Sequence, residues 1–488
     1  MQRFNFQFVF SSIGVTLMIE AVFMLLSALV GEYYHEPSVN YLYMSAIITF
    51  CSGVALYGAG RIKKKNNRIT KREAFFIVTF VWISLVLFGC LPYTLGGAIT
   101  SFTNAFFESM SGFTAVGSTT LSNIEAFPKS LLFWRSLTHW IGGIGILIFV
   151  MSFISVFGGT AVQLYSAEVT GISEQQFKPR ISDITRSMSV TYLFLTLSGF
   201  LLLWAGPMDA FDAACHSFSA ISTGGFSTKQ AGIAHFNSAY VEYVLIVLMF
   251  LGATNFTLIF QLLRHFSPRI AKDEEFRWYA SLIGIFTFVT IVYMYIKGYD
   301  DGSFEDTFRT ALFQVVSSIS TTAFTTVDFL EWGEFYWFLF LAMVLFCGCE
   351  GSTSGGMKIS RLILLTKNAR LSFKRFVHSQ ALYMVKINGQ VVSNTVIEKA
   401  LSFIFLYFAI IGVSSIALSL TGMSFNESFG TAISTLGNNG IGLGRFGPSG
   451  NFIHATTAAK YILCFLMLVG RLEIFTVLSL IVPSFWKK

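Results

Sequence analysis

Long apolar runs alternate with short polar stretches from one end of this chain to the other. Two runs come first, at roughly 8–30 and 41–60, and each is about the 20 residues that a helix needs to cross a bilayer. The same order then recurs four times: a long apolar run, a segment too short to span, a stretch rich in Gly, Ser and Thr, and another apolar run. The pattern predicts an all-α membrane protein of about ten transmembrane helices. Four repeats of outer helix, pore helix and inner helix would surround a central pore, with two further helices at the N-terminus.

The bounds of these elements follow from the runs. Outer helices are expected at 75–98, 187–206, 278–297 and 396–421, pore helices at 101–113, 208–221, 304–319 and 425–436, and inner helices at 131–157, 239–263, 335–365 and 456–482. The predicted organisation is a two-helix extension at 1–70 and pore repeats at 71–185, 186–275, 276–380 and 381–488, the third with a broken inner helix.

The four polar stretches align without gaps and are the candidate ion filter. Polar backbone inside a membrane is tolerated only where protein buries it or where it lines a wet cavity. Four such stretches around one axis would form a ring of backbone carbonyls that replaces the hydration shell of a cation. Tight packing of small residues between helices is the alternative, and four aligned copies favour the filter. The candidate residues are Thr114, Ala115, Val116 and Gly117; Ser222, Thr223, Gly224 and Gly225; Ser320, Thr321, Thr322 and Ala323; and Asn438, Asn439 and Gly440.

The third inner helix meets a polar interruption that is the candidate gate. Residues 348–356 contain four glycines and three hydroxyl side chains, and discontinuous helices near the membrane midplane mark ion pathways. The candidate gating residues are Gly348, Glu350, Gly351, Ser352, Thr353, Ser354, Gly355 and Gly356, together with Arg471 in the last inner helix. An intramembrane arginine needs a partner, and we expect Glu350 rather than Glu473. A structural kink in the loop and a purely structural ion pair at Arg471 are the alternatives.

Composition indicates an integral membrane protein and argues against several other classes. The chain is 54% hydrophobic and 12% charged, whereas soluble domains carry about 25% charged residues. No metal-ligand spacing or nucleophile–base pattern is found, so no enzyme is expected, and the net charge of +7 lies in short loops and does not indicate nucleic acid binding. The basic loops at 61–72, 264–277 and 361–374 and the tail Lys487-Lys488 predict that both termini are cytoplasmic. Four acids near the pore helices, Glu108, Asp212, Asp306 and Glu427, are either charges at helix ends and loops or residues that concentrate cations at the mouth.

The segments 222–228 (STGGFST), 351–358 (GSTSGGMK), 436–444 (LGNNGIGLG) and 470–473 (GRLE) resemble the Trk/Ktr/HKT superfamily of cation transporters, and specifically its TrkH-type subunits. The resemblance covers essentially the whole chain. It implies channel-like uptake of potassium across a bacterial inner (cytoplasmic) membrane, with K+ held by the filter carbonyls and no covalent cofactor. It also implies a homodimer in the lipid bilayer and a cytosolic nucleotide-binding (TrkA-like) regulatory ring. A sodium-permeable protein or a cation-coupled symporter of the same fold is the alternative.

In the resemblance, Gly117, Gly225 and Gly440 are the critical filter glycines, 348–356 is the intramembrane gating loop, and Arg471 is the inner-helix arginine. Two positions depart from the family pattern. Ala323 stands where the third filter glycine is expected, and a Cβ there would turn one of four carbonyls out of line, against strict potassium selectivity. Glu350 replaces a small residue and adds a negative charge beside the ion path.

Overall fold

The computed structural model describes residues 4–60, 71–157, 181–265, 269–299, 302–378 and 383–486. Within these ranges the chain is helical almost throughout, and its strands are the two-residue β1 (Lys386–Ile387) and β2 (Gln390–Val391), which form an antiparallel hairpin. Six of the described helices are long and apolar enough to cross a membrane, or seven if one bent pair counts as a single span. The basic loop at 61–70 and Lys487-Lys488 lie outside the described residues.

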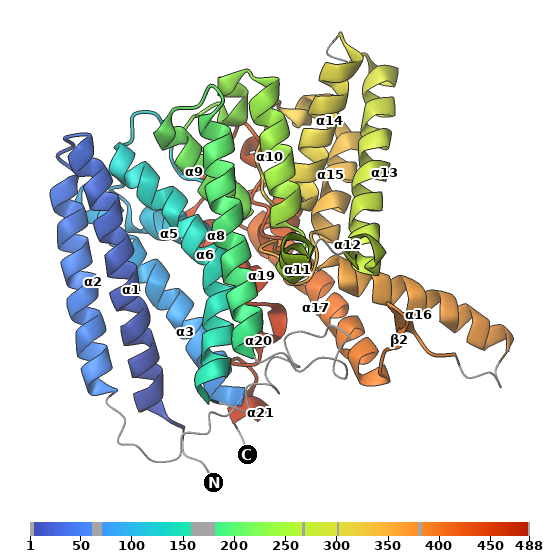
Figure 1. Cartoon of the computed structure of the whole chain (residues 1–488), viewed down its shortest axis with the longest axis horizontal. Coiled ribbons are helices and arrows are strands. Elements are labelled where there is room, and N and C mark those ends of the chain that lie inside the picture. The colour runs from blue at the N-terminus through green and yellow to red at the C-terminus, as the bar shows by residue number, and fades with distance from the viewer. Residues whose placement is uncertain are drawn as a thin grey trace.

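The N-terminal helices α1 (Phe6–Tyr33) and α2 (Val39–Ala59) pack as a close antiparallel pair at one side of the bundle (Figure 1). Glycines make this close approach possible, because a Cβ at Gly14 would lie 2.6 Å from the Gly53 carbonyl oxygen. Small residues at helix contacts are the usual basis of such packing inside membranes. The other face of α1 packs against α3 (Lys71–Gly89) and α6 (Lys129–Phe157), so the pair is anchored to the first repeat.

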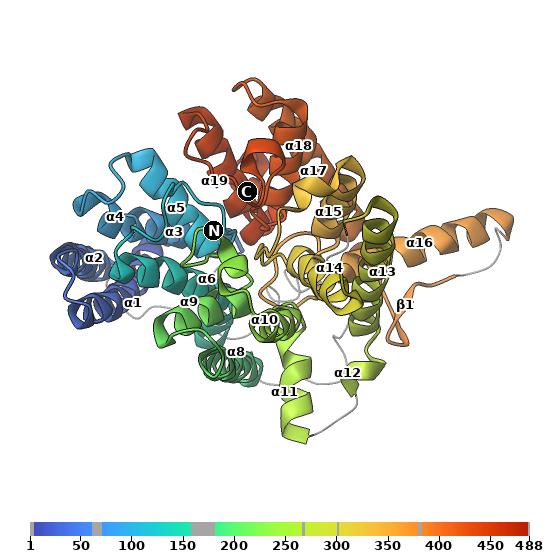
Figure 2. The ribbon, with the colours of Figure 1, turned by 90° about the horizontal axis from the view of Figure 1, so that it is seen from above.

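Four units of outer helix, short helix and inner helix follow one another around the centre of the molecule (Figure 2). They are α3 with α4 (Leu91–Leu95), α5 (Phe102–Thr114) and α6; α8 (Ile181–Trp204), α9 (Ala210–Ile221) and α10 (Ala239–Gly252); α13 (Glu274–Lys297), α14 (Phe304–Ile319) and α15 (Glu334–Phe346); and α17 (Asn394–Ser419), α18 (Phe425–Leu436) and α19 (Thr457–Arg471). Contacts between α5 and α19 join the last unit to the first and close the circle.

Three of the four short helices, α9, α14 and α18, begin at capping residues, which explains why their starts could be predicted closely. Asp209, Ser303 and Ser424 each accept a hydrogen bond from a backbone N–H of the first turn of α9, α14 and α18. Such caps satisfy donors that have no partner within the helix. The predicted 304–319 and 425–436 coincide with α14 and α18, while α5 and α9 each begin one or two residues later than expected.

The inner helices differ from the prediction, which expected an interruption in the third repeat alone. The predicted second inner helix is two helices, α10 and α11 (Phe256–His265), bent by 107°. The fourth ends at Arg471 and resumes as α20 (Ile474–Leu478), whereas α6 runs on without a break. At the break in the second inner helix, the carbonyls of Gly252 and Ala253 accept hydrogen bonds from the third repeat's loop rather than from their own helix.

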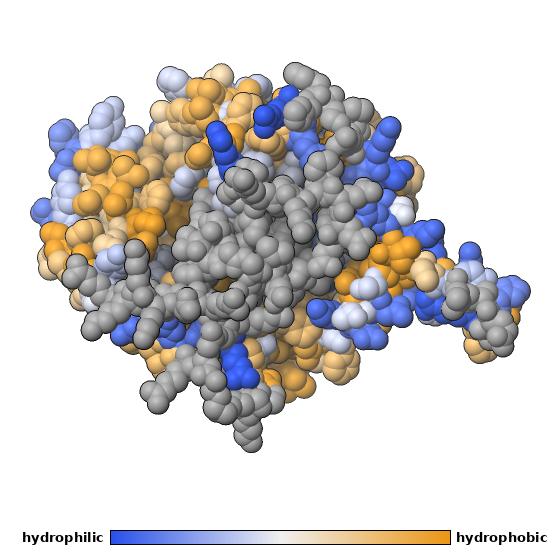
Figure 3. Space-filling view, turned by 60° about the horizontal axis from the view of Figure 1, so that its bottom comes forward, coloured by the Kyte–Doolittle hydropathy of each residue, from blue (hydrophilic) through white to orange (hydrophobic). Residues whose placement is uncertain are grey.

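The remaining elements lie at the periphery. Helix α16 (Ile359–Val377) follows the third break and projects sideways from the lower half of the bundle in Figure 1. Five further helical segments of three to five residues in the described part of the chain are α12 (Arg269–Lys272), α21 (Pro483–Trp486), η1 (Gly232–Phe236), η2 (Phe329–Trp332) and η3 (Gly444–Phe446). Large apolar side chains such as Ile47, Phe338 and Phe405 are exposed, and broad hydrophobic areas cover the flanks in Figure 3, as expected of a surface that faces lipid.

Candidate ion filter and gate

Each short helix ends in the same backbone reversal. Just after the helix, one residue donates its N–H to the carbonyl three residues back, and the next residue donates to the carbonyl five residues back, at 2.8–3.2 Å in all four repeats; the first donors are Ala115, Thr223, Thr321 and Asn438. This pair of bonds is the Schellman motif. The acceptor five residues back is a serine every time: Ser111, Ser219, Ser317 and Ser434. The four predicted filter stretches therefore leave their helices along equivalent paths.

Two residues in every stretch have positive φ. The first is not glycine in any repeat: Ala115, Thr223, Thr321 and Asn438 have φ of 52°, 54°, 61° and 56°. The second is Gly117, Gly225, Ala323 or Gly440, with φ of 87°, 82°, 63° and 85°. A left-handed conformation costs most residues with a Cβ about 1–2 kcal/mol, whereas glycine and sometimes asparagine adopt it routinely, so four of these eight positions are strained: Ala115, Thr223, Thr321 and Ala323. Strain of this kind gathers at functional sites.

The glycines pack against the neighbouring repeat and show how the stretches are arranged. A Cβ at Gly117 would lie 2.4 Å from the Gly224 carbonyl oxygen, and one at Gly225 would lie 2.0 Å from that of Thr322. A Cβ at Gly440 would lie 2.0 Å from the carbonyl oxygen of Val116. The first stretch thus meets the second, the second meets the third, and the fourth returns to the first. Together with the circle of helices in Figure 2, these contacts place the four stretches around one centre.

Ala323 follows the backbone path of the glycine that it replaces. Its φ of 63° lies in the left-handed region, below the 82–87° of the three glycines. Its amide N–H lies 3.5 Å from the Ser317 carbonyl oxygen, the distance that separates the Gly440 amide from the Ser434 carbonyl. The third stretch therefore keeps a left-handed backbone at this position although Ala323 carries a Cβ that its three glycine counterparts lack.

The polar side chains of the predicted filter bond to nearby backbone. Thr114 and Ser222 donate their hydroxyls to the carbonyls of Met110 at 2.6 Å and Phe218 at 2.7 Å. The Ser320 hydroxyl pairs with that of Thr322 at 2.7 Å. Asn438 and Asn439 donate to the carbonyls of Met467 at 3.2 Å and Ser318 at 3.3 Å, which ties the fourth stretch to α19 and α14. Among the described residues, the side-chain amide oxygens of both asparagines are buried without a hydrogen-bond partner.

The predicted gating loop contacts the ends of three pore helices and their filter stretches. The Thr353 hydroxyl donates to the carbonyl of Ile221, the last residue of α9, at 2.8 Å. The Thr321 hydroxyl lies 3.1 Å from that of Ser354 and accepts the Gly355 N–H at 3.1 Å. A Cβ at Gly355 would lie 2.5 Å from that of Asn438, so the loop also abuts the fourth stretch. A segment far away in sequence is thus held directly against repeats two, three and four.

The other loop residues hold its shape. The Ser354 hydroxyl accepts the Gly348 N–H at 3.0 Å, and the Ser352 hydroxyl donates to the Cys349 carbonyl. The Gly351 carbonyl accepts the Phe256 N–H at 3.2 Å, which attaches the loop to the start of α11. A Cβ at Gly356 would lie 2.0 Å from the Cys347 sulfur, so this glycine is required for packing as well as for its φ of 68°.

The predicted partner of Arg471 is wrong. Its guanidinium donates to the carbonyls of Thr353 in the loop and Gly142 in α6, both at 2.7 Å. Glu350 does not bond the arginine; its backbone N–H donates to the Glu275 carboxylate at 2.7 Å. Glu473 pairs with Arg361 of α16 at 2.6 Å. One of these carbonyls belongs to the irregular backbone of the loop and the other to the continuous helix α6, and together they bind the arginine where a carboxylate was expected.

The comparisons with known proteins agree over the whole length of the chain. The family profile for TrkH, described as a cation transport protein, matches residues 43–488. The chain belongs to the TrkH family of cation transport proteins. It is 33% identical to the Trk system potassium uptake protein TrkH of Escherichia coli K12, over 99% of this chain and 100% of that protein. It is similar to the crystal structure of the potassium transporter TrkH from Vibrio parahaemolyticus, with a TM-score of 0.90 and 32% identity over 99% of this chain and 100% of that one.

Membership of the TrkH family confirms the all-α membrane fold and shows that the chain is an ion transport protein and not an enzyme. Among the described residues, no three His, Cys, Asp or Glu side chains gather as metal ligands.

Every one of the four acids near the TrkH-family pore helices has a basic partner. Glu108 pairs with Arg135 at 2.6 Å, Asp212 with Lys229 at 3.2 Å, Asp306 with Arg309 at 2.6 Å and Glu427 with Arg445 at 2.8 Å. Asp212, Asp306 and Glu427 lie in the first turns of their helices, as one of the two sequence interpretations held. Glu108 fits neither interpretation, because it is fully buried in α5.

One polar residue of each pore helix belongs to a set that the sequence interpretation did not recognise, although it named Glu108 by itself. Glu108, His216, Gln314 and Thr431 each stand nine residues before the second positive-φ residue of their stretch. Three of them hold the segment that follows the filter: Glu108 accepts the Thr120 N–H at 2.8 Å, His216 bonds the Ser227 hydroxyl at 3.0 Å, and Gln314 bonds that of Thr326 at 3.1 Å. Their shared spacing could have identified the set from the sequence, but the four side chains differ in chemistry and so do not form an obvious motif.

Proposed function

We propose that this protein conducts potassium across the bacterial cytoplasmic membrane through a pore of its own, in the direction of uptake. The closed ring of four equivalent filter stretches carries the proposal. Each stretch follows the C-terminal end of a short helix, where the helix dipole places a partial negative charge. Four such ends and a ring of carbonyls favour a dehydrated cation over an anion. The Escherichia coli relative is a potassium uptake protein and the Vibrio parahaemolyticus relative is a potassium transporter, which supports potassium as the ion.

A channel-like mechanism and coupled symport make different predictions for purified protein in liposomes. A channel-like pore accumulates potassium in response to an imposed membrane potential alone. A symporter also needs a gradient of its second ion. Potassium uptake that rises with the potential in otherwise symmetric solutions is the expected result. Uptake that starts only when a proton or sodium gradient is added would favour the symporter of the same fold.

We also propose that residues 348–356 and Arg471 gate this pore. The loop touches the ends of repeats two, three and four, and Arg471 bonds both the loop and the first inner helix. These contacts tie the loop to repeats two, three and four directly and to the first repeat through Arg471. An ion that leaves the filter on this side would meet the loop and a buried guanidinium, so conduction requires that they move.

The proposed assembly has both termini on the cytoplasmic side, a homodimer, and a cytosolic nucleotide-binding ring as regulator. The Phe4 and Trp486 rings, 5.9 Å apart, put the two described ends on one side of the molecule, which supports an even number of crossings. The basic residues of α16, such as Arg370 and Lys374, offer a surface for an acidic partner. Reversing these charges should abolish binding of a TrkA-like protein at low salt, and retained binding would reject this docking surface.

The replacement Ala323→Gly is expected to keep the potassium-to-sodium flux ratio at its parent value or raise it. Glycine removes the Cβ that holds φ at 63° and lets the third stretch reach the 82–87° of its counterparts. The flux ratio of the purified variant in liposomes is the measurement. A fall in potassium selectivity would mean that Ala323 is tuned for the ion rather than tolerated, and would favour the sodium-permeable alternative.

A further inference from the structure

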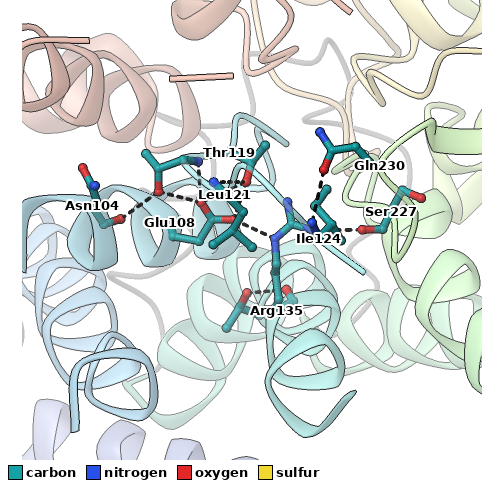
Figure 4. A network of polar contacts seen from close by, with 10 residues as sticks. Asn104, Glu108, Thr119, Leu121, Ile124, Arg135, Ser227 and Gln230 are labelled. Carbon is teal, nitrogen blue, oxygen red and sulfur yellow. Dashed lines mark hydrogen bonds and ion pairs between the residues drawn. The ribbon is translucent and has the colours of Figure 1, made fainter. Parts of the chain in front are cut away.

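One buried ion pair links the segments that follow the first two filter stretches. Glu108 of α5 and Arg135 of α6 meet at 2.6 Å, and their side chains are 0% and 2% exposed (Figure 4). Burial of both charges requires that each also be satisfied by hydrogen bonds. The groups that hydrogen-bond to the two charges are therefore held in place by the pair, and these groups belong to two different repeats.

The carboxylate holds the first repeat. Glu108 accepts the backbone N–H of Thr120 at 2.8 Å and the hydroxyl of Thr119 at 2.9 Å, three and two residues beyond Gly117 respectively. Charge-assisted bonds of this kind are stronger than bonds between neutral groups. The Glu108 carboxylate thus fixes the chain immediately after the first filter stretch.

The guanidinium holds the second repeat. Arg135 donates to the Ser227 carbonyl at 3.0 Å, and its guanidinium carbon lies 3.5 Å from the centroid of the Phe226 ring. Phe226 directly follows Gly225, and its ring also stacks on His139 with centroids 3.9 Å apart. His216 bonds the Ser227 hydroxyl from the other side of the same segment. A planar guanidinium that bonds and stacks in this way cannot be replaced by lysine without loss.

The third and fourth repeats are held differently. In the third, the neutral Gln314 bonds Thr326, and in the fourth the Thr431 hydroxyl is buried without a partner among the described residues. The Glu427–Arg445 pair of the fourth repeat is exposed on its arginine side, where 67% of the side chain is accessible. Within the described chain, the buried charged link is thus a feature of the first two stretches.

We infer that Glu108 and Arg135 are positioning residues for ion selectivity: their buried ion pair fixes the Gly117 and Gly225 stretches relative to each other. This inference rests on the proposed potassium pore. A carbonyl ring discriminates between ions by the spacing and the number of its oxygens. Gly117 already touches Gly224 with no room for a Cβ, so a shift of either segment changes the ring directly.

The test compares Arg135→Gln with the parent in two measurements on full-length protein. The potassium-to-sodium flux ratio in liposomes should fall about tenfold, equivalent to about 1.4 kcal/mol of lost discrimination. Hydrogen exchange of peptides that cover 117–121 and 225–228 should become faster. The matched control is Arg309→Gln, which removes a carboxylate-bound guanidinium from α14 that touches no filter residue, and it should leave both measurements unchanged.

The outcomes separate this inference from the proposed function. A parent protein that fails to prefer potassium rejects the proposed function, and the exchange measurement then decides positioning alone. Unchanged exchange in Arg135→Gln overturns the positioning role, and faster exchange with an unchanged flux ratio overturns the selectivity role. If Arg135→Gln does not fold, the double variant Glu108→Gln with Arg135→Gln leaves no unpaired buried charge and is held to the same expectations.

Discussion

Replacing Gly225 by serine should reduce the potassium-to-sodium flux ratio by about tenfold or more, because no Cβ fits at this position. The new atom would lie 2.0 Å from the Thr322 carbonyl oxygen, and the residue would have to keep a φ of 82°. Either the second stretch leaves its left-handed conformation or the third stretch moves away. Both responses change the carbonyl ring, and a loss of discrimination of 1.4 kcal/mol is already tenfold.

The measurement is ion flux in liposomes at matched protein content. Gly298→Ser is a suitable control, because Gly298 also has a positive φ, 70°, yet a Cβ there would meet nothing within 4 Å. This control carries the backbone strain of the substitution without the clash. If Gly225→Ser kept the parent flux ratio in a folded protein, the assignment of this stretch to the filter would be wrong.

Replacing Arg471 by alanine should raise potassium flux about tenfold. The guanidinium carries a full charge beside the loop, and a charge at about 4 Å in an effective dielectric near 20 contributes about 4 kcal/mol. A third of that barrier corresponds to about tenfold in rate. The substitution also frees the loop, because both bonds of Arg471, to Thr353 and Gly142, are lost.

A conservative variant separates the charge from the bonds. Arg471→Lys keeps the positive charge but cannot bridge two carbonyls with a planar fork. Parent-like flux in this variant would assign the barrier to the charge, and alanine-like flux would assign it to the bonds that hold the loop. Adding Glu350→Ala to Arg471→Ala should change little, since Glu350 is not the partner of the arginine. A folded Arg471→Ala protein that conducts less than the parent would contradict the gating role.

Local sequence signals predicted the elements that depend on local interactions. The bounds of α14 and α18 were correct because Ser303 and Ser424 cap their first turns and polar stretches end them. The second positive-φ residue of each filter stretch was also visible, since glycine occupies it three times in four. The first was not, because alanine and threonine, which stand there in three of the four repeats, rarely adopt this conformation, and only Asn438 is of a type that favours it.

Features that depend on distant partners were not predictable from the pattern. The break between α10 and α11 falls at the short segment 252–255 within a longer apolar run, and the hydrogen bonds from Cys349 and Thr353 to Ala253 and Gly252 that hold it come from a distant loop. Arg471 was rightly expected inside the protein with a partner. The sequence suggested a carboxylate because charges usually pair. Only the fold reveals that the loop leaves a free carbonyl within reach.

The central claim is that the ring of four stretches selects potassium, and the flux of the two ions through the purified protein tests it most directly. Liposomes that contain the unmodified protein would be given inward gradients of potassium or of sodium of the same size, at the same membrane potential. We predict that potassium enters about tenfold faster or more, and that empty liposomes take up neither ion. Equal entry of both ions, or faster entry of sodium, would contradict the account.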